Sequence, residues 1–254
     1  VREDDTRKGL LFAGTELGIF ISWNGGSDWH LFQLNLPVTP ITDLKVHQGN
    51  LIASTSGRSF WILDDLSLLR QFKAETNSFT LFKPADAFLV NGSSPLDSID
   101  PEFNGAHPYM GVNPATGVVL YYNLPELKEH DHITLEIKDA QGNLVRSYTS
   151  VKDSTFVRYD GGPSADPVMT KSKGLNRFVW NMRYPTMPGV PGVYIESSYR
   201  GHKAIPGKYS ATLKSGGLTA SVEFQILPNP LYPTDAATYQ EYHAVMRKME
   251  QEVF

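Results

Sequence analysis

The chain has 254 residues, a formal net charge of −4 and no cysteine. This length is enough for the hydrophobic cores of one large or two ordinary domains. The slight negative charge provides no basic surface for nucleic acid or anionic lipid, so neither is expected as a partner. The absence of cysteine excludes disulfides, thiolate nucleophiles and cysteine-bound zinc. No apolar run is long enough to predict a membrane span.

The composition favours an all-β chain. It includes 21 glycines and 17 prolines, and strand-like runs recur about every ten residues, as they do in β-sandwiches and barrels. In residues 1–72 these runs are separated by tight turns at 16–18, 24–26 and 48–50. The apolar side chains expected to fill the faces of these strands are Phe12, Ile19, Ile21, Leu44, Val46, Leu51, Ile52, Phe60 and Ile62.

The run 22–29, SWNGGSDW, has the spacing of serine, a short polar residue, glycine and tryptophan that a tight hairpin loop uses. It resembles the Asp-box, SxDxGxxW, of sialidase-like and sortilin-like propellers, with Asn24 in place of the usual aspartate and Asp28 where threonine is common. The resemblance implies that the polar side chain bonds loop N–H groups, that the glycine takes a positive φ and that the tryptophan packs beneath. We expect a structural role, rather than a metal or sugar site, for Ser22, Asn24, Gly26 and Trp29.

The run 36–65 contains LPVTPITDLKVH and, after it, ASTSGRSFWILDD. It resembles the closing blade of the large bacterial BNR-repeat proteins, which are sortilin-like and often labelled glycosyl hydrolases; Ser56 stands where they have histidine. A propeller needs about four to eight blades of four strands, and residues 1–72 hold about one and a half. The resemblance therefore implies the end of a longer propeller protein, periplasmic or secreted, with its signal peptide outside this sequence and the remainder of the propeller as a partner.

Paired carboxylates can perform acid–base catalysis, which directs attention to Asp64 and Asp65, with Arg58 nearby. Adjacent residues of a regular strand point to opposite faces, so these two acids are not expected to share a site. An ion pair or a cap at the end of the strand is the preferred interpretation.

The polar loop 91–115 is long enough to be functional, and it holds the potential metal ligands Asp97, Asp100, Glu102 and His107, with Tyr109 beside them. It lacks the ligand spacing of a known calcium loop. His130 and His132 share a strand face, but no third ligand is apparent. We therefore assign no metal, no cofactor and no catalytic residue.

Two predicted hairpins, at 132–148 and 205–226, flank the run 174–184, GLNRFVWNMRY. Each hairpin alternates apolar and polar residues around a glycine-containing turn. In the central run, Leu175, Phe178 and Trp180 are predicted to cross the middle of a two-sheet core. The ordered series resembles the immunoglobulin-like domain of flagellar hook-capping proteins, which implies an immunoglobulin or fibronectin III-like β-sandwich.

The loop 185–204 is too long for a hairpin. It carries five apolar or aromatic residues that form a possible contact surface: Met187, Val190, Val193, Tyr194 and Tyr199. Exposed, they would bind a glycan or protein partner; packed against the propeller, they would join two domains, which is the preferred interpretation.

Residues 231–254 change to helical spacing, with Thr234 as the predicted N-cap and an apolar series at Tyr239, Tyr242, Val245 or Met246, Met249 and Val253. In the resembled proteins a helical segment follows, which implies that this helix has lost a partner. The predicted organisation is thus a partial propeller at 1–72, a linker at 73–80, a β-sandwich at 81–230 and a C-terminal helix at 231–254.

Two functions remain. The first is a non-catalytic structural or interaction module at the C-terminal end of a larger exported protein. The second is a fragment of a sialidase-like glycoside hydrolase whose active site lies in the missing blades. A sialidase site needs an arginine cluster, a Tyr–Glu nucleophile and an acidic residue, and this sequence shows no such set, so the first function is preferred.

Overall fold

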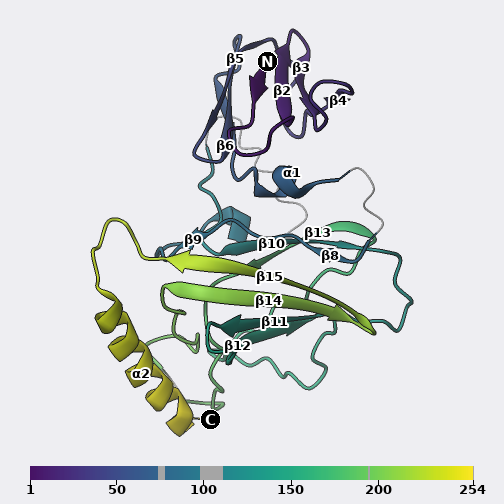
Figure 1. Ribbon diagram of the computed structural model, residues 1–254. Coiled ribbons are helices and arrows are strands. Elements are labelled where there is room, and N and C mark those ends of the chain that lie inside the picture. The colour runs from purple at the N-terminus through teal and green to yellow at the C-terminus, as the bar shows by residue number, and fades with distance from the viewer. Residues whose placement is uncertain (74–77, 98–110, 194, 254) are drawn as a thin grey trace. The chain divides into compact units, whose positions relative to one another are not determined.

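The computed structural model describes residues 1–73, 78–97, 111–193 and 195–253 (Figure 1). The described chain is mostly β-sheet, as predicted, and ends in one long helix. It divides into two compact units. The first is Val1–Thr76 with the described residues of Asp100–Pro114, and the second is Asn77–Ile99 with Ala115–Phe254. In the described part of the chain, no helix is both long and apolar enough to cross a membrane.

The first unit contains two antiparallel sheets and a short helix. One sheet has the order β1-β2-β3-β4, and the other has the order β5-β6-β7. The strands are β1 (Arg2–Glu3), β2 (Leu11–Thr15), β3 (Gly18–Ser22), β4 (His30–Leu31), β5 (Ile41–His47), β6 (Asn50–Thr55) and β7 (Phe60–Leu63), and the helix is α1 (Ser67–Gln71). The two sheets share one core, to which Leu66 at the start of α1 also belongs.

Most of the predicted apolar faces of the first unit are confirmed, but the face of β7 is reversed. Phe12, Ile19, Ile21, Leu44 and Leu51 are buried, whereas Val46 and Ile52 are half-buried. Phe60 is 74% exposed and Ile62 is 59% exposed, so their predicted place in the core is wrong.

The pairing of β7 with β6 explains this reversal. Leu63 lies opposite Leu51 and Trp61 lies opposite Ala53, and both of these partners are buried. Cross-strand neighbours point to the same face of a sheet, so Trp61 and Leu63 pack on the core and the residues between them face outward. The alternation of FWIL is apolar in both phases, and the sequence alone did not select between them.

The second unit also contains two sheets. The smaller has the order β13-β10-β8, and the larger has the order β12-β11-β14-β15-β9, in which β9 pairs parallel to β15. The strands are β8 (Thr80–Leu81), β9 (Ala87–Phe88), β10 (Val118–Leu124), β11 (Thr134–Asp139), β12 (Leu144–Thr149), β13 (Gly174–Trp180), β14 (Gly207–Ser215) and β15 (Leu218–Leu227). Both predicted hairpins are confirmed, as β11 with β12 and β14 with β15.

One core fills the space between these two sheets. Trp180 is fully buried, with its ring centroid 5.8 Å from that of Tyr209 and 6.2 Å from that of Phe224. Leu175, by contrast, is 52% exposed, and the prediction that it lies in the core is wrong. Strand alternation places Asn176, Phe178 and Trp180 on the inner face. Moreover, β13 is an edge strand, bonded only to β10, and not the middle of its sheet.

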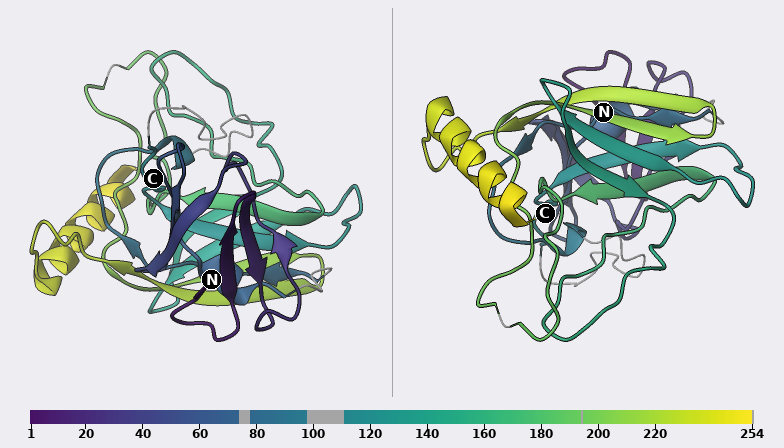
Figure 2. Two further views of the ribbon diagram at one scale, coloured as in Figure 1. Left: turned by 90° about the horizontal axis from the view of Figure 1, so that it is seen from above. Right: turned by 90° about the horizontal axis from the view of Figure 1, so that it is seen from below.

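Helix α2 (Ala236–Val253) follows β15 and stands at the end of the sheet where that strand finishes (Figures 1 and 2). Its N-cap is Asp235, whose carboxylate accepts a hydrogen bond of 2.7 Å from the Thr238 N–H; the prediction of Thr234 is therefore wrong by one residue. In the predicted apolar series Tyr242, Val245 and Met249 are exposed, whereas Tyr239 and Met246 are half-buried. Among the described side chains of the helix, the buried one is Glu250.

Candidate functional site

The loop 22–29 is held by its own polar side chains. Asn24 Oδ1 accepts a hydrogen bond of 2.9 Å from the Asp28 N–H, and Asn24 Nδ2 donates to Asp28 Oδ2 at 2.7 Å. Ser22, which is fully buried, accepts a bond of 3.0 Å from the Gly26 N–H. Gly26 has a φ of 92°, a conformation that favours glycine. The polar atoms of this loop are therefore used in closing the loop.

The tryptophan that packs against the first unit from this loop is Trp23 rather than Trp29. The Trp23 indole N–H donates to the Leu69 carbonyl at 3.1 Å, and its ring centroid lies 5.1 Å from that of Phe72. Trp29 is 38% exposed. The Trp29 ring nevertheless lies against the loop, as the Asp-box resemblance implies, because a Cβ added at Gly26 would be 3.6 Å from Trp29 Cζ2.

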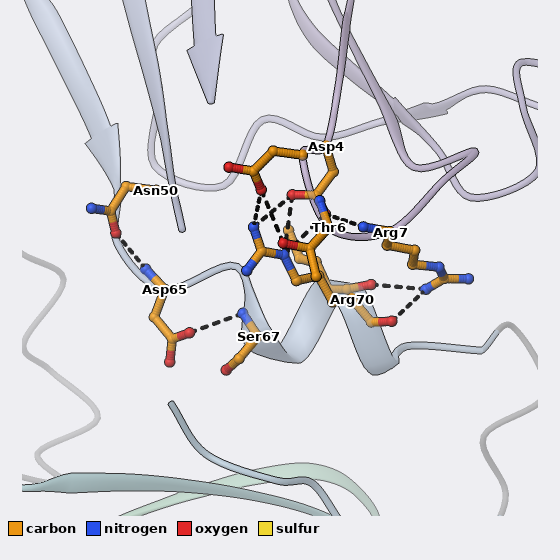
Figure 3. A network of polar contacts seen from close by, with 9 residues as sticks. Asp4, Thr6, Arg7, Asn50, Asp65, Ser67 and Arg70 are labelled. Carbon is orange, nitrogen blue, oxygen red and sulfur yellow. Dashed lines mark hydrogen bonds and ion pairs between the residues drawn. The ribbon is translucent and has the colours of Figure 1, made fainter. Parts of the chain in front are cut away.

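A charged network joins the N-terminal segment of the first unit to α1 (Figure 3). Asp4 is 5% exposed, and its carboxylate accepts two bonds from the Arg70 guanidinium, the shorter at 2.8 Å. It also accepts bonds from the N–H groups of Thr6 and Arg7, at 3.2 and 2.7 Å. Burial opposes the ionisation of Asp4, but the bonds from Arg70 and Arg7 outweigh it and hold the pKa below its usual value.

Of the two acids that follow β7, Asp64 and Asp65, the second makes hydrogen bonds within the first unit. The Asp65 carboxylate accepts a bond of 2.9 Å from the Ser67 N–H at the start of α1, while the Asp65 N–H donates to Asn50 Oδ1 at 2.9 Å. Figure 3 shows these two contacts beside the Asp4 network. Burial, and then the neighbouring charge of Asp65, raises the pKa of Asp64. Asp65 therefore closes a turn at the start of α1. Both acids lie beyond Leu63, the last residue of β7, and Asp65 has a φ of 57°, so the alternation of a regular strand does not set their directions.

The described part of the loop 91–115 also uses its carboxylate structurally. Asp97 accepts bonds from the Thr116 N–H at 2.6 Å, from the Thr116 hydroxyl at 2.8 Å and from the Ser94 N–H at 2.8 Å. The other candidates in this loop, Asp100, Glu102, His107 and Tyr109, lie outside the described residues. His130 and His132 are both exposed, and no group of three potential metal ligands is present among the residues that the structure describes.

The second unit contains a cleft of about 810 Å³ beside the C-terminal half of β12. Its floor includes Ser147, Tyr148 and Thr149, and its walls come from the segments 151–168 and 186–188. The Met169 N–H donates to the Thr149 carbonyl at 2.9 Å, which holds the end of one wall against the strand. Sequence reasoning missed this cleft, because loops without periodicity build it.

The charges at this cleft are unevenly matched. Arg146, which is 6% exposed, pairs with Asp166 on the wall and lies over the Tyr148 ring, with 5.1 Å from the guanidinium carbon to the ring centroid. Lys152 and Arg158 are exposed on the rim, and neither forms an ion pair within the described chain. Asp153 and Asp166 line the same cleft, so its charged side chains are of both signs.

The predicted contact surface in the loop 185–204 is divided. Met187 lines the cleft, whereas Val190 and Val193 are 63% and 54% exposed. The Tyr199 hydroxyl is buried beside that of Tyr159, and the Tyr199 carbonyl accepts a bond of 2.7 Å from the Met187 N–H. Tyr194 lies outside the described residues. Only Met187 of this set thus contributes to a hollow of the surface.

A second polar cluster holds α2 on the second unit. His202 is 4% exposed, and its Nδ1 lies 2.6 Å from Oε1 of the buried Glu250. Its Nε2 lies 3.0 Å from Nδ1 of His243, which is about two helical turns before Glu250 on α2. Arg247 donates to Glu250 Oε2 at 2.8 Å. The Tyr184 ring stacks on the His202 imidazole, with 4.3 Å between centroids.

Ionisation in this cluster follows from burial and charge. Burial, and then the electrostatic interactions with His202 and Arg247, lowers the pKa of His243. Burial alone would raise the pKa of Glu250, but the hydrogen bond and electrostatic interaction with His202 outweigh it and lower that pKa. Burial raises the pKa of the Tyr184 hydroxyl to about 12. The helix is thus attached to the second unit through a carboxylate and two imidazoles.

Comparison with protein-family models, with curated proteins and with solved structures gives no significant match to this chain.

Proposed function

We propose that this chain is a non-catalytic structural and interaction module of a larger exported protein. In this proposal the first unit supplies the last blades of a BNR-type propeller, and the second is an immunoglobulin-like sandwich that presents a binding cleft. The observation that carries the proposal is the use of the candidate carboxylates: Asp65 accepts the Ser67 N–H at the start of α1, and Asp97 ties Ser94 to Thr116. Carboxylates that accept backbone N–H groups in this way are oriented by the fold and not toward a bound sugar.

Three observations support the structural part of the proposal. Short antiparallel sheets make up the first unit, and a self-closed loop at 22–29 lies between β3 and β4. Two sheets enclose a single core around Trp180 in the second unit. Each feature agrees with the family resemblances of the sequence, and none requires a reaction.

The interaction part rests on the cleft beside β12. A hollow of about 810 Å³ is within the usual size of ligand sites. Phe156 and Met187 give it apolar walls, and its rim carries the cations Lys152 and Arg158 together with the anion Asp153. The partner that suits this cleft is a glycan or a protein segment that combines apolar surface with polar groups.

The test is an activity assay of the purified 254-residue chain against panels of aryl glycosides and sialosides. We expect no turnover, because glycoside hydrolysis needs two carboxyl groups about 5–10 Å apart on either side of the bound sugar. Glu102→Gln and Asp64→Asn are the diagnostic variants, and Glu126→Gln, at an exposed carboxylate, is the matched control. Turnover that either diagnostic variant abolishes and the control retains would replace this proposal with the glycosidase alternative.

A further inference from the structure

We propose that the His202–His243 contact is a proton-sensitive latch, which holds α2 on the second unit near neutral pH and releases it in acid. The inference is independent of whether the chain has a catalytic or a binding role. It depends on the direct contact between two imidazoles, one of which is buried against a carboxylate.

The hydrogen bonds fix where the protons lie in the attached state. Glu250 accepts from Arg247 at 2.8 Å and therefore lies as a carboxylate beside His202, at 2.6 Å. A carboxylate requires a donor, so His202 carries its proton on Nδ1. In neutral His202 the Nε2 atom is then an acceptor, and the His243 Nδ1, 3.0 Å away, must donate to it.

This chain of bonds tolerates one additional proton but not two. If either imidazole is protonated alone, the remaining neutral ring can still place one hydrogen between Nε2 and Nδ1. When both are protonated, two N–H groups and two positive charges oppose each other at 3.0 Å. Burial strengthens this repulsion, since His202 has no access to solvent on its side chain. The attached state therefore excludes the doubly protonated pair.

The groups around the pair do not remove this conflict. From α2, Arg247 adds a further positive charge. The Tyr242 ring lies edge-on to the His202 ring, with 6.1 Å between the two centroids. From the second unit, Tyr184 is a neutral ring stacked on His202. Asp139 at the end of β11 and Glu250 favour protonation of His243, but their effect is smaller than those of burial, His202 and Arg247.

The helix has little else to hold it in place once this contact fails. Tyr242, Val245 and Met249 are exposed and Tyr239 and Met246 are only half-buried, so releasing the helix uncovers little apolar surface. An isolated helix of 18 residues is marginal in water. Release should therefore be accompanied by loss of helical hydrogen bonds in 236–253, which makes it measurable by amide exchange.

The experiment is hydrogen–deuterium exchange of the full chain at pH 7.5 and 5.5, corrected for the intrinsic pH dependence of exchange, with β14 as an internal reference. An imidazole with an ordinary pKa of about 6.5, kept neutral only in the attached state, changes the release equilibrium by about tenfold between these pH values. We expect exchange in 236–253 to accelerate by about tenfold or more at pH 5.5, while β14 is unchanged.

Two variants and one control separate the latch from a general loss of stability. His243→Asn keeps a donor near the Nδ1 position and cannot take up a proton, so exchange in 236–253 should become insensitive to pH. His130→Asn, at an exposed histidine of the same unit, should respond as the unaltered chain does. Glu250→Gln should accelerate exchange already at pH 7.5. Equal protection of 236–253 at both pH values in the unaltered chain, or an undiminished acid response in His243→Asn, would overturn the proposal.

Discussion

Trp180 is the largest fully buried side chain among the described residues. Replacing it with alanine removes its contacts with Tyr209 and Phe224 and leaves a cavity between the two sheets. We expect Trp180→Ala to lower the free energy of unfolding of the second unit by about 3–5 kcal/mol. The measurement is urea denaturation followed by far-ultraviolet circular dichroism.

The matched control lies on the same strand. Leu175→Ala removes an apolar side chain that is 52% exposed, so its cost should stay below about 1 kcal/mol. Equal costs for the two variants would contradict the inner face assigned to β13.

The Asn24 and Asp28 side chains are hydrogen-bonded to each other within the loop 22–29, so a substitution at one affects the other. Asn24→Asp would keep the acceptor for the Asp28 N–H but would lose the 2.7 Å bond from Nδ2 and place two carboxylates together. We expect a loss on the order of 1 kcal/mol, diminished by salt. Thermal denaturation of the first unit at low and high salt measures it.

The double variant provides the decisive comparison for this loop. Asp28→Thr in combination with Asn24→Asp restores a neutral hydroxyl beside the carboxylate and should recover most of the lost stability. A double variant no more stable than Asn24→Asp alone would show that the two side chains are not coupled.

At the scale of elements, β7 offers a test of which face is buried. Leu63 packs on the core opposite Leu51, whereas Ile62 is 59% exposed. Leu63→Ala should therefore cost about 1–3 kcal/mol, and Ile62→Ala less than about 1 kcal/mol. Thermal denaturation of both variants decides the question; a larger cost for Ile62→Ala would restore the original prediction of the strand's face.

β7 also shows which features of a strand a sequence pattern can predict and which it cannot. Positions and pairings of β2, β3, β5, β6, β11, β12, β14 and β15 follow from alternation and turn residues, and these were predictable. The buried face of a strand was not predictable where the residues on both faces are apolar, as in Phe60–Leu63. For Leu175, the run was apolar enough to suggest burial, but Asn176 takes the inner position and bonds the carbonyls of Ser172 and Gly174 at 2.6 and 2.9 Å.

The polar sites were less accessible to sequence reasoning. His202 and Glu250 are 48 residues apart, and no local spacing connects them. The apolar spacing of α2 did not predict this contact, because helical periodicity shows that a helix is amphipathic without stating which side its neighbour occupies. The cleft beside β12 depends on how two loops fold back, which alternation does not encode. By contrast, the loop bonds of Asn24 were anticipated from residue type and spacing.

At the scale of the whole molecule, two cores that share no residue predict two unfolding transitions. Asp4→Ala leaves Arg70 without its buried carboxylate and should lower the first unit's transition, at a cost of roughly 2–3 kcal/mol because Arg70 is partly exposed. Trp180→Ala should lower only the other transition. Differential scanning calorimetry of the two variants makes the comparison.

Acid provides an independent check on the first of these transitions. The pKa of Asp4 is lowered in the folded unit, so its ionised form stabilises the unit above the unfolded pKa of about 4, and that contribution is lost as the pH falls further. Asp4→Ala should therefore lower the temperature of the first unit's transition and also reduce the acid sensitivity of that same transition. A single transition shifted alike by both variants would contradict two independent cores.

The polar face that α2 turns toward the second unit has a calorimetric consequence. Heat capacity changes on separation scale with the apolar surface that becomes wet, and polar surface contributes with the opposite sign. Separation of α2 exposes Glu250, Arg247 and His243 together with the ring of Tyr184, so its heat capacity increment should be small. Its attachment should then vary with pH and ionic strength far more than with temperature.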